Sequence, residues 1–280
     1  MENWGFWAAI GAAVCWGSYM VPFKKSHSSN LRQFQAMIAV GVGISGLLLA
    51  PVLGYPLNLN IYGLLSGSLW AVANAASLVA VLNLGISRAV PLMSSLVILS
   101  SFLWGVLVFH ELPGGLAAGF VGIGLIVAGV VIVSITGNIQ SQNIKRGLIT
   151  AISAGLIFGS QLVPLKMGSV ATKDFFWSVC LGIFLTGVLI ALALKTKFKN
   201  ESVKMGLLSG VIWNIGNLLS LISVSMIGLS KAGPISQLAV LVAVVWGLFY
   251  FKEITKPKHR VQVLIGAMVI LIGVVTLAMA

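Results

Sequence analysis

The sequence predicts an all-α membrane protein with ten transmembrane helices, arranged as two inverted five-helix repeats. Three observations lead to this fold class: an apolar composition, ten apolar windows of spanning length, and a second half that repeats the first. Of the 280 residues, 59% are hydrophobic and only 8% are charged, and the mean hydropathy is +1.07. Such a chain has too little polar surface to cover a water-soluble globule, so its helices are expected to lie in lipid.

Ten windows are long enough to cross a bilayer, which takes about 20 apolar residues per helix. They cover residues 4–23, 32–53, 61–83, 88–109, 115–136, 146–166, 175–195, 204–225, 231–251 and 261–279. Basic loop residues predict the orientation, because Lys and Arg near helix ends are retained on the cytoplasmic side. Fourteen of them fall in one set of loops and three in the opposite set, which places both termini outside the cytoplasm.

The second half of the chain repeats rare residue types of the first at an offset of 142 to 144 residues. Residues 17–24 read GSYMVPFK and residues 159–166 read GSQLVPLK, identical at five of eight positions. Further pairs are Trp70/Trp213, Asn74/Asn217, Ser77/Ser220, Pro91/Pro234, Trp104/Trp246 and Glu111/Glu253. Because each half holds five helices, the second enters the membrane in the opposite sense. The predicted repeats are residues 1–143 and 144–280, an arrangement typical of alternating-access transporters with a site between the halves.

Polar side chains in the middle of a span are costly unless they face protein or water, so they indicate a solute pathway. The solute-binding candidates are Trp16, Ser18, Trp70, Asn74, Ser77, Ser94, Gln161, Asn214, Asn217, Ser220 and Gln237. They belong to the first, third, fourth, sixth, eighth and ninth windows, which are expected to surround one cavity, with the other four as scaffold. Amide and hydroxyl groups beside indole rings suit a neutral polyhydroxylated solute. The alternative is that the amides bond between helices and the indoles anchor at the interface.

Two matching prolines, Pro22 and Pro164, lie where they would stop or kink the first and sixth helices. Each is followed two residues later by a lysine, Lys24 or Lys166. We interpret these four residues as a gate or hinge, with a purely structural kink as the alternative. Pro91 and Pro234 are instead expected in the first turns of their helices, where proline is tolerated.

Acidic residues are absent from the middle of the predicted spans, so the usual intramembrane proton relay is not visible. Glu111 and Glu253 end the fourth and ninth windows and are expected to be gate or interface residues. Their nearest basic neighbours in the sequence are His110 and Lys252, which are the expected partners.

The sequence also argues against other classes of protein. It offers no clustered nucleophile, base or metal set, and Cys15 and Cys180 lack any metal or redox spacing. We therefore predict no catalytic residue, no metal site, no cofactor and no enzyme activity. The basic residues are scattered through loops rather than gathered on a patch, so no nucleic-acid partner is expected. The expected partners are a small solute and the lipid bilayer, with protons as the candidate coupling ion.

Several motifs resemble those of a known transporter family. Residues 16–25 (WGSYMVPFKK), residues 235–253 (ISQLAVLVAVVWGLFYFKE) and the pair Trp70 and Asn74 carry the resemblance. With the repeat, they make the chain similar to the drug/metabolite transporter superfamily, and within it to the glucose/ribose porter group and the related rhamnose transporters. The resemblance implies uptake of a monosaccharide across the plasma membrane, often by proton symport. Export of metabolites or amphipathic compounds on the same fold is the alternative, because a fold does not decide the substrate.

Overall fold

The computed structural model describes residues 2–26, 30–109, 116–134, 143–196, 200–227, 235–236 and 238–278. Within these ranges all regular structure is helical, which confirms the all-α prediction. The helices are α1 (Glu2–Ser18), α2 (Val21–Lys25), α3 (Leu31–Val52), α4 (Ile61–Leu84), α5 (Ile86–Leu107), α6 (Leu116–Ser134), α7 (Ile144–Ser160), α8 (Val163–Met167), α9 (Thr172–Ala193), α10 (Asn200–Ile227), α12 (Ala239–Val245), the π-helix η1 (Trp246–Tyr250) and α13 (Pro257–Ala278). Seven described helices are long and apolar enough to cross a membrane.

Two spans are interrupted at the prolines that the sequence singles out. The first divides into α1 and α2, and the sixth divides into α7 and α8. Pro22 and Pro164 lie in the first turns of the short helices α2 and α8, and both are buried. Proline is suited to a first turn because its missing N–H has no partner there in any case, and its ring prevents continuation of the preceding helix. The predicted interruptions are confirmed.

The start of α5 differs from its expected position. The helix begins at Ile86, so Pro91 lies inside it rather than in its first turn. Asparagine side chains cap α3, α4 and α7 in the usual way. At α5 the cap residue is Gly85, which has φ +81° and no side chain of its own. The carboxylate of Glu253 takes its place, accepting the N–H groups of Ile86 at 2.7 Å and Ser87 at 2.8 Å.

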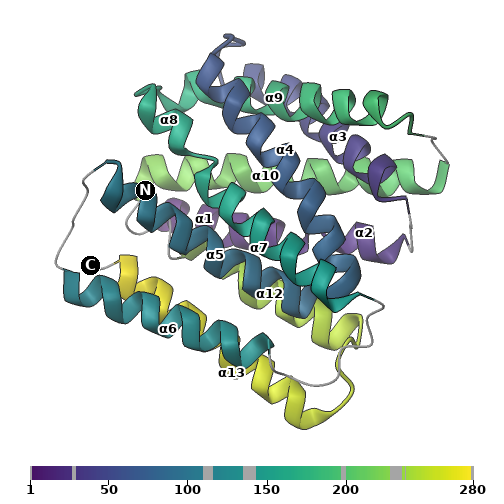
Figure 1. Cartoon of the computed structure of the whole chain (residues 1–280). Coiled ribbons are helices and arrows are strands. Elements are labelled where there is room, and N and C mark those ends of the chain that lie inside the picture. Colours follow the sequence, from purple (N-terminus) through teal and green to yellow (C-terminus); the bar gives the residue numbers. More distant parts are fainter. Residues whose placement is uncertain are drawn as a thin grey trace.

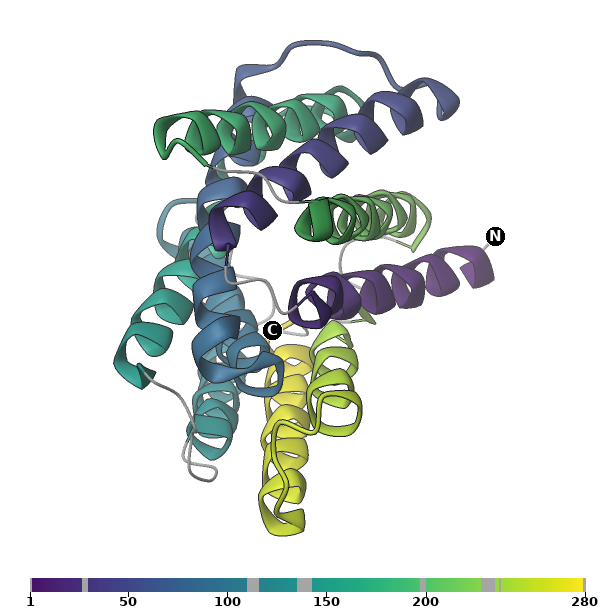
Figure 2. The ribbon, with the colours of Figure 1, turned by 90° about the vertical axis from the view of Figure 1, so that its right-hand side faces the viewer.

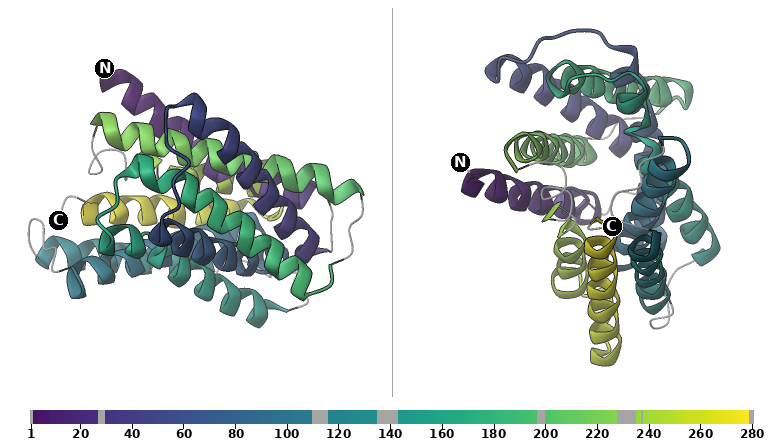
Figure 3. Two further views of the ribbon diagram at one scale, coloured as in Figure 1. Left: turned by 90° about the horizontal axis from the view of Figure 1, so that it is seen from above. Right: turned by 90° about the vertical axis from the view of Figure 1, so that its left-hand side faces the viewer.

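The helices form two matching groups with a helix pair at each end. In one group α1 packs against α10 and α12, and in the other α7 packs against α4 and α5. The right-hand view of Figure 3 shows these groups on opposite sides of the molecule. Figures 1 and 2 show α3 with α9 at one end of the assembly and α6 with α13 at the other. The two groups meet where α5 packs against α12.

Gly67 and Gly210 bring helix backbones into the closest contact. A Cβ atom at Gly67 of α4 would lie 2.2 Å from the carbonyl oxygen of Val179 on α9. A Cβ atom at Gly210 of α10 would lie 2.2 Å from the carbonyl oxygen of Ile38 on α3. Small residues permit this close approach. In a membrane, helices associate mainly through close packing, because lipid tails are as apolar as the helix side chains and the hydrophobic effect does not drive the helices together. These crossings fix α4 against α9 and α10 against α3.

Candidate functional site

The centre of the molecule holds a pair of indole rings. Trp70 of α4 and Trp213 of α10 lie with ring centroids 4.2 Å apart and ring planes tilted by 46°. Both are buried, with 2% and 6% of their surfaces exposed. Phe158 and Tyr19 lie beside Trp70, at centroid distances of 6.0 and 6.5 Å. An aromatic cluster therefore joins the two helix groups, and its central pair is formed by two tryptophans that stand 143 residues apart (213 − 70), within the offset at which the two halves of the sequence match.

Asn74 lies one turn after Trp70 and is fully buried. Its Nδ2 donates to Oε1 of Gln35 at 2.6 Å, and its Oδ1 accepts from the hydroxyls of Tyr19 at 3.2 Å and Ser77 at 3.3 Å. The Gln35 amide in turn donates to the carbonyl of Ala71 at 3.0 Å. The network ties α4 to α3 and to the residue that follows α1.

Two members of this network, Gln35 and Tyr19, were not among the predicted site residues. The sequence predicts that the second window is scaffold, yet α3 carries two buried polar side chains, Gln35 at 2% exposure and Ser45 at 7%. Gln35 lies in the second turn of α3, and a polar residue so close to the end of a span is usually taken to lie at the membrane boundary. The available signal was an amide inside an otherwise apolar window, and Tyr19 stands in the repeated motif itself.

Asn214 lies in a separate contact. Its Nδ2 donates to the Ser45 hydroxyl at 2.9 Å, and the Cys180 thiol donates to its Oδ1 at 3.4 Å. The residue is fully buried and joins α10 to α3 and α9. The structure therefore does not bring Asn214 together with Trp70 and Asn74.

Six other predicted solute-binding residues are half-buried. They are Trp16, Ser18, Ser94, Gln161, Asn217 and Ser220. Trp16 packs on Gly216 of α10, and its Nε1 is buried without a hydrogen-bond partner in the described part of the chain. Ser18 accepts from Nε1 of Trp246 at 2.9 Å. Gln237 lies outside the described residues.

Glu253 forms an ion pair that links the two halves of the chain. Its carboxylate accepts from Lys24 of α2, from the two N–H groups at the start of α5, and from the Ser87 hydroxyl. Only 8% of the Glu253 side chain is exposed, against 30% for Lys24. The expected pairing of Glu253 with Lys252 is therefore wrong, whereas Glu111 and His110 lie outside the described residues.

The surroundings of Glu253 hold its carboxyl in the ionised form. Burial raises the pKa of this carboxyl, but the charge of Lys24 and the hydrogen bonds from Lys24 and Ser87 outweigh it and leave the pKa below its ordinary value. Arg88, which is 8% exposed, adds a further positive charge near the carboxylate. A carboxylate at a helix N-terminus is also favoured by the helix dipole.

This shift predicts a pH dependence of stability. The folded pKa of Glu253 is lower than the unfolded value of about 4.3, so its contribution is complete above that pH and is lost as the pH falls through the folded pKa. We expect the unfolding temperature of the purified protein to fall more steeply below about pH 4 than that of a Lys24→Met variant. Differential scanning fluorimetry between pH 7 and 3 measures this. Parallel curves for the two proteins would contradict the assignment, and Lys25→Met, which changes the neighbouring exposed lysine, is the control.

Lys166, the gate candidate in the second half of the chain, contacts an aromatic ring as Lys24 does. The Lys166 ammonium lies 4.9 Å from the ring centroid of Phe109, and the Lys24 ammonium lies 5.5 Å from that of Phe251. Both distances suit a cation–π interaction. Lys166 is exposed, unlike the partly buried Lys24. The two lysines therefore have equivalent aromatic partners but different degrees of burial.

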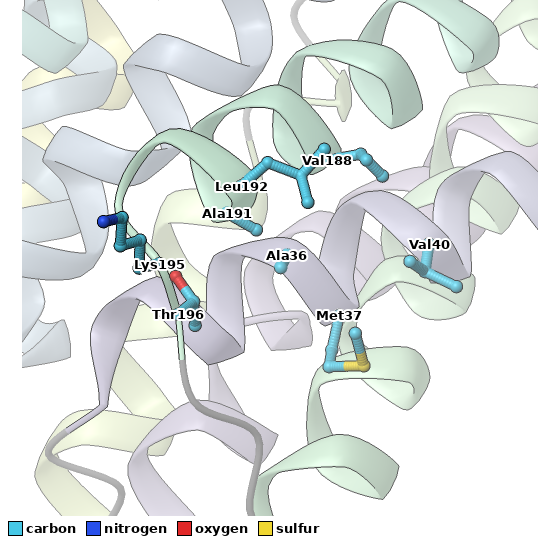
Figure 4. A pocket seen from close by; sticks show the side chains of 8 residues that line it. All are labelled: Ala36, Met37, Val40, Val188, Ala191, Leu192, Lys195 and Thr196. Atoms are coloured by element: carbon cyan, nitrogen blue, oxygen red, sulfur yellow. The ribbon is translucent and has the colours of Figure 1, made fainter.

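A groove of about 500 Å³ lies between α3 and α9, away from the aromatic centre. Figure 4 shows the side chains around it, most of them apolar, with Lys195 and Thr196 at one end. None of the predicted solute-binding or gate residues lines it. We therefore do not assign the solute to this groove.

Comparisons with known proteins agree with this architecture. Residues 8–280 match the family described as sugar transport protein. The glucose uptake protein GlcU of Bacillus subtilis is 23% identical over 97% of both chains. A protein of Priestia megaterium described as a probable glucose uptake protein GlcU is 25% identical, over 97% of this chain and 98% of its own. A solved crystal structure with 17% identity and a TM-score of 0.60 covers 95% of both chains and has the same fold. Because the family match covers nearly the whole chain, this protein belongs to the sugar transport protein family.

Proposed function

We propose that this protein is an uptake carrier for a monosaccharide in the plasma membrane and works by alternating access. The observation that carries the proposal is the meeting of Trp70 and Trp213 between the two helix groups. An indole face suits the apolar face of a pyranose, and half-buried amide and hydroxyl groups nearby suit its polar edge. The relatives described as glucose uptake proteins support the same class of solute.

The carrier is proposed to consist of two inverted repeats, residues 1–143 and 144–280. Matched contacts support this division. The Trp246 indole donates to Ser18 at 2.9 Å, and the equivalent Trp104 donates to Ser160 at 2.8 Å. The packing of α1 on α10 likewise corresponds to the packing of α7 on α4. Such repeats place the solute site between the halves and let the two halves exchange conformations.

The gate is proposed to lie at the Lys24–Glu253 ion pair. With both termini outside, this ion pair is at the cytoplasmic end. At the same end the Ser209 hydroxyl donates to the carbonyl of Tyr19. Ser66, the counterpart of Ser209 in the first half, is buried and has no hydrogen-bond partner within the described residues. This difference supports a conformation closed toward the cytoplasm, in which Pro22 and Lys24 form the shut gate and Pro164 and Lys166 the opposite one.

The proposal is tested by uptake of a panel of radiolabelled monosaccharides into proteoliposomes, with and without an inward proton gradient. We expect saturable uptake of at least one sugar by the wild type. We expect Trp213→Leu, which removes the aromatic face, to lower uptake at low sugar concentration about tenfold, since a stacked ring contributes about 1.5 kcal/mol. Trp213→Phe, which keeps an aromatic ring, should retain most of the wild-type uptake.

The outcomes of this experiment distinguish proton-coupled uptake, facilitated uptake and export from one another. Uptake that increases with the gradient identifies protons as the coupling ion, and uptake independent of it identifies a facilitator. If correctly folded protein takes up none of the sugars, the uptake proposal fails and export of metabolites becomes the preferred function. Gel filtration of each variant in detergent shows whether it is folded.

A further inference from the structure

The two asparagines that the repeat makes equivalent have different surroundings. Asn74 is fully buried, and its amide is bonded to Gln35, Tyr19 and Ser77. Asn217 is half-buried, and its side chain has no hydrogen-bond partner among the residues described. An amide without a partner is stable only where water or a ligand can reach it.

The side chain of Asn217 is directed into the protein. Leu208 and Ile215 are 48% and 37% exposed and mark the lipid side of α10. Asn217 follows Ile215 by two residues, which is a rotation of about 200° around a helix and places it away from lipid. Trp213 precedes it by four residues and therefore lies on the same face. The half-buried amide thus faces the interior beside the aromatic pair.

The sequence explains why only Asn74 is bonded in this way. The two glycine crossings make Ile38 of α3 equivalent to Val179 of α9, an offset of 141 residues (179 − 38). At this offset the counterpart of Gln35 is Phe176 (35 + 141), a fully buried residue that cannot accept a hydrogen bond. Asn217 therefore has no equivalent of the glutamine that bonds Asn74.

We infer that Asn217 is the amide that binds the hydroxyl groups of the sugar, and that Asn74 is a positioning residue. The inference rests on the proposed uptake function and refines its site. A primary amide offers two N–H donors and an oxygen acceptor, so it can bond two neighbouring hydroxyls of a monosaccharide while Trp213 covers the apolar face of the ring. Asn74, held by Gln35, keeps α4 and α3 in register so that Trp70 meets Trp213.

Uptake kinetics separate the two roles. Asn217→Ala should raise KM at least about fivefold with an unchanged unfolding temperature, because a hydrogen bond to the solute is lost and no internal bond is broken. Asn74→Ala and Gln35→Leu should lower the unfolding temperature and the maximal rate while KM stays within about twofold of the wild type. Asn217→Gln, which keeps the amide, should recover part of the affinity. An unchanged KM in Asn217→Ala, or an equal rise in Asn74→Ala, overturns the inference.

A second experiment does not depend on uptake. In a protein carrying Cys15→Ser and Cys180→Ala, Asn217→Cys should react with a charged, water-soluble thiol reagent, whereas Asn74→Cys should not. Sugars from the panel should slow the reaction of Asn217→Cys increasingly as their concentration is raised. If the wild type transports no sugar, the proposed function fails. The inference itself fails if Asn217→Cys does not react, or if none of the sugars protects it.

Discussion

Replacing Glu253 with alanine is expected to lower the free energy of unfolding by about 3 kcal/mol and to reduce uptake about tenfold or more. Removing one member of a buried ion pair costs about 3–5 kcal/mol, and the partial exposure of Lys24 places the effect near the lower end. The start of α5 also loses its cap, because Gly85 offers no side chain to replace the carboxylate. Uptake is expected to fall because the proposed gate loses the ion pair that closes it.

Unfolding in detergent, followed by tryptophan fluorescence, measures the stability change, and proteoliposome uptake measures the second effect. Glu253→Gln should be intermediate, since its oxygen still accepts the N–H groups of α5 but carries no charge for Lys24. Asp174→Ala is the matched control, because among the residues described this carboxylate bonds only to the exposed Asn58 side chain, at 3.3 Å. Wild-type stability in Glu253→Ala would show that the ion pair does not hold the halves together.

Adding one methyl group at a helix crossing should be comparably damaging. Gly67→Ala and Gly210→Ala are each expected to lower the free energy of unfolding by about 3 kcal/mol, or to prevent folding. The new Cβ would lie 2.2 Å from a carbonyl oxygen in both cases, so whole helices must separate. Overpacking usually costs about 1–3 kcal/mol, and contact with backbone rather than a flexible side chain puts these sites at the upper end.

The chain supplies its own control for this experiment. A methyl group added at Gly124 of α6 would meet no described atom within 4 Å. Gly124→Ala should therefore be neutral or slightly stabilising, because alanine favours a helix over glycine. Yield and thermal unfolding of the three variants can be compared directly. Equal stability of all three would show that α4 and α10 do not approach their neighbours through glycine.

Much of the fold could be predicted because a chain that crosses a lipid bilayer can adopt few kinds of secondary structure. Apolar windows of spanning length predicted the helical segments in their correct order, and the two prolines marked the interruptions before α2 and α8. Sequence motifs also identified the family. These features depend on residues close together in the chain, where spacing and composition carry the information.

The contacts of the site could not be predicted in the same way. Lys24 and Glu253 are 229 residues apart, and sequence proximity favoured Lys252 instead. Lys252 adopts φ +50° just beyond η1, and its side chain is exposed. The sequence match pairs Asn74 with Asn217, but it does not predict that Asn74 alone has a hydrogen bond to Gln35. Which partner a polar side chain meets depends on the packing of α3, which its own sequence does not reveal.

The glycine crossings also determine which parts of the carrier can move relative to one another. Beside Gly67 and Gly210, three further glycines bring a carbonyl oxygen within 2.5–2.7 Å of an added Cβ: Gly17 between α1 and α12, Gly159 between α7 and α5, and Gly129 between α6 and α13. Backbones in contact cannot slide without separating. Each of these five couples takes one helix from the first half of the chain and one from the second.

By contrast, α1 meets α10 and α4 meets α7 through side chains, such as Trp16 against Gly216 and Leu84 against Gly147. Side chains can change rotamer, so we expect these two interfaces to shear more readily than the couples held by backbone contact. We therefore expect the units that stay intact during transport to be helix couples, each of which takes one helix from either half of the chain.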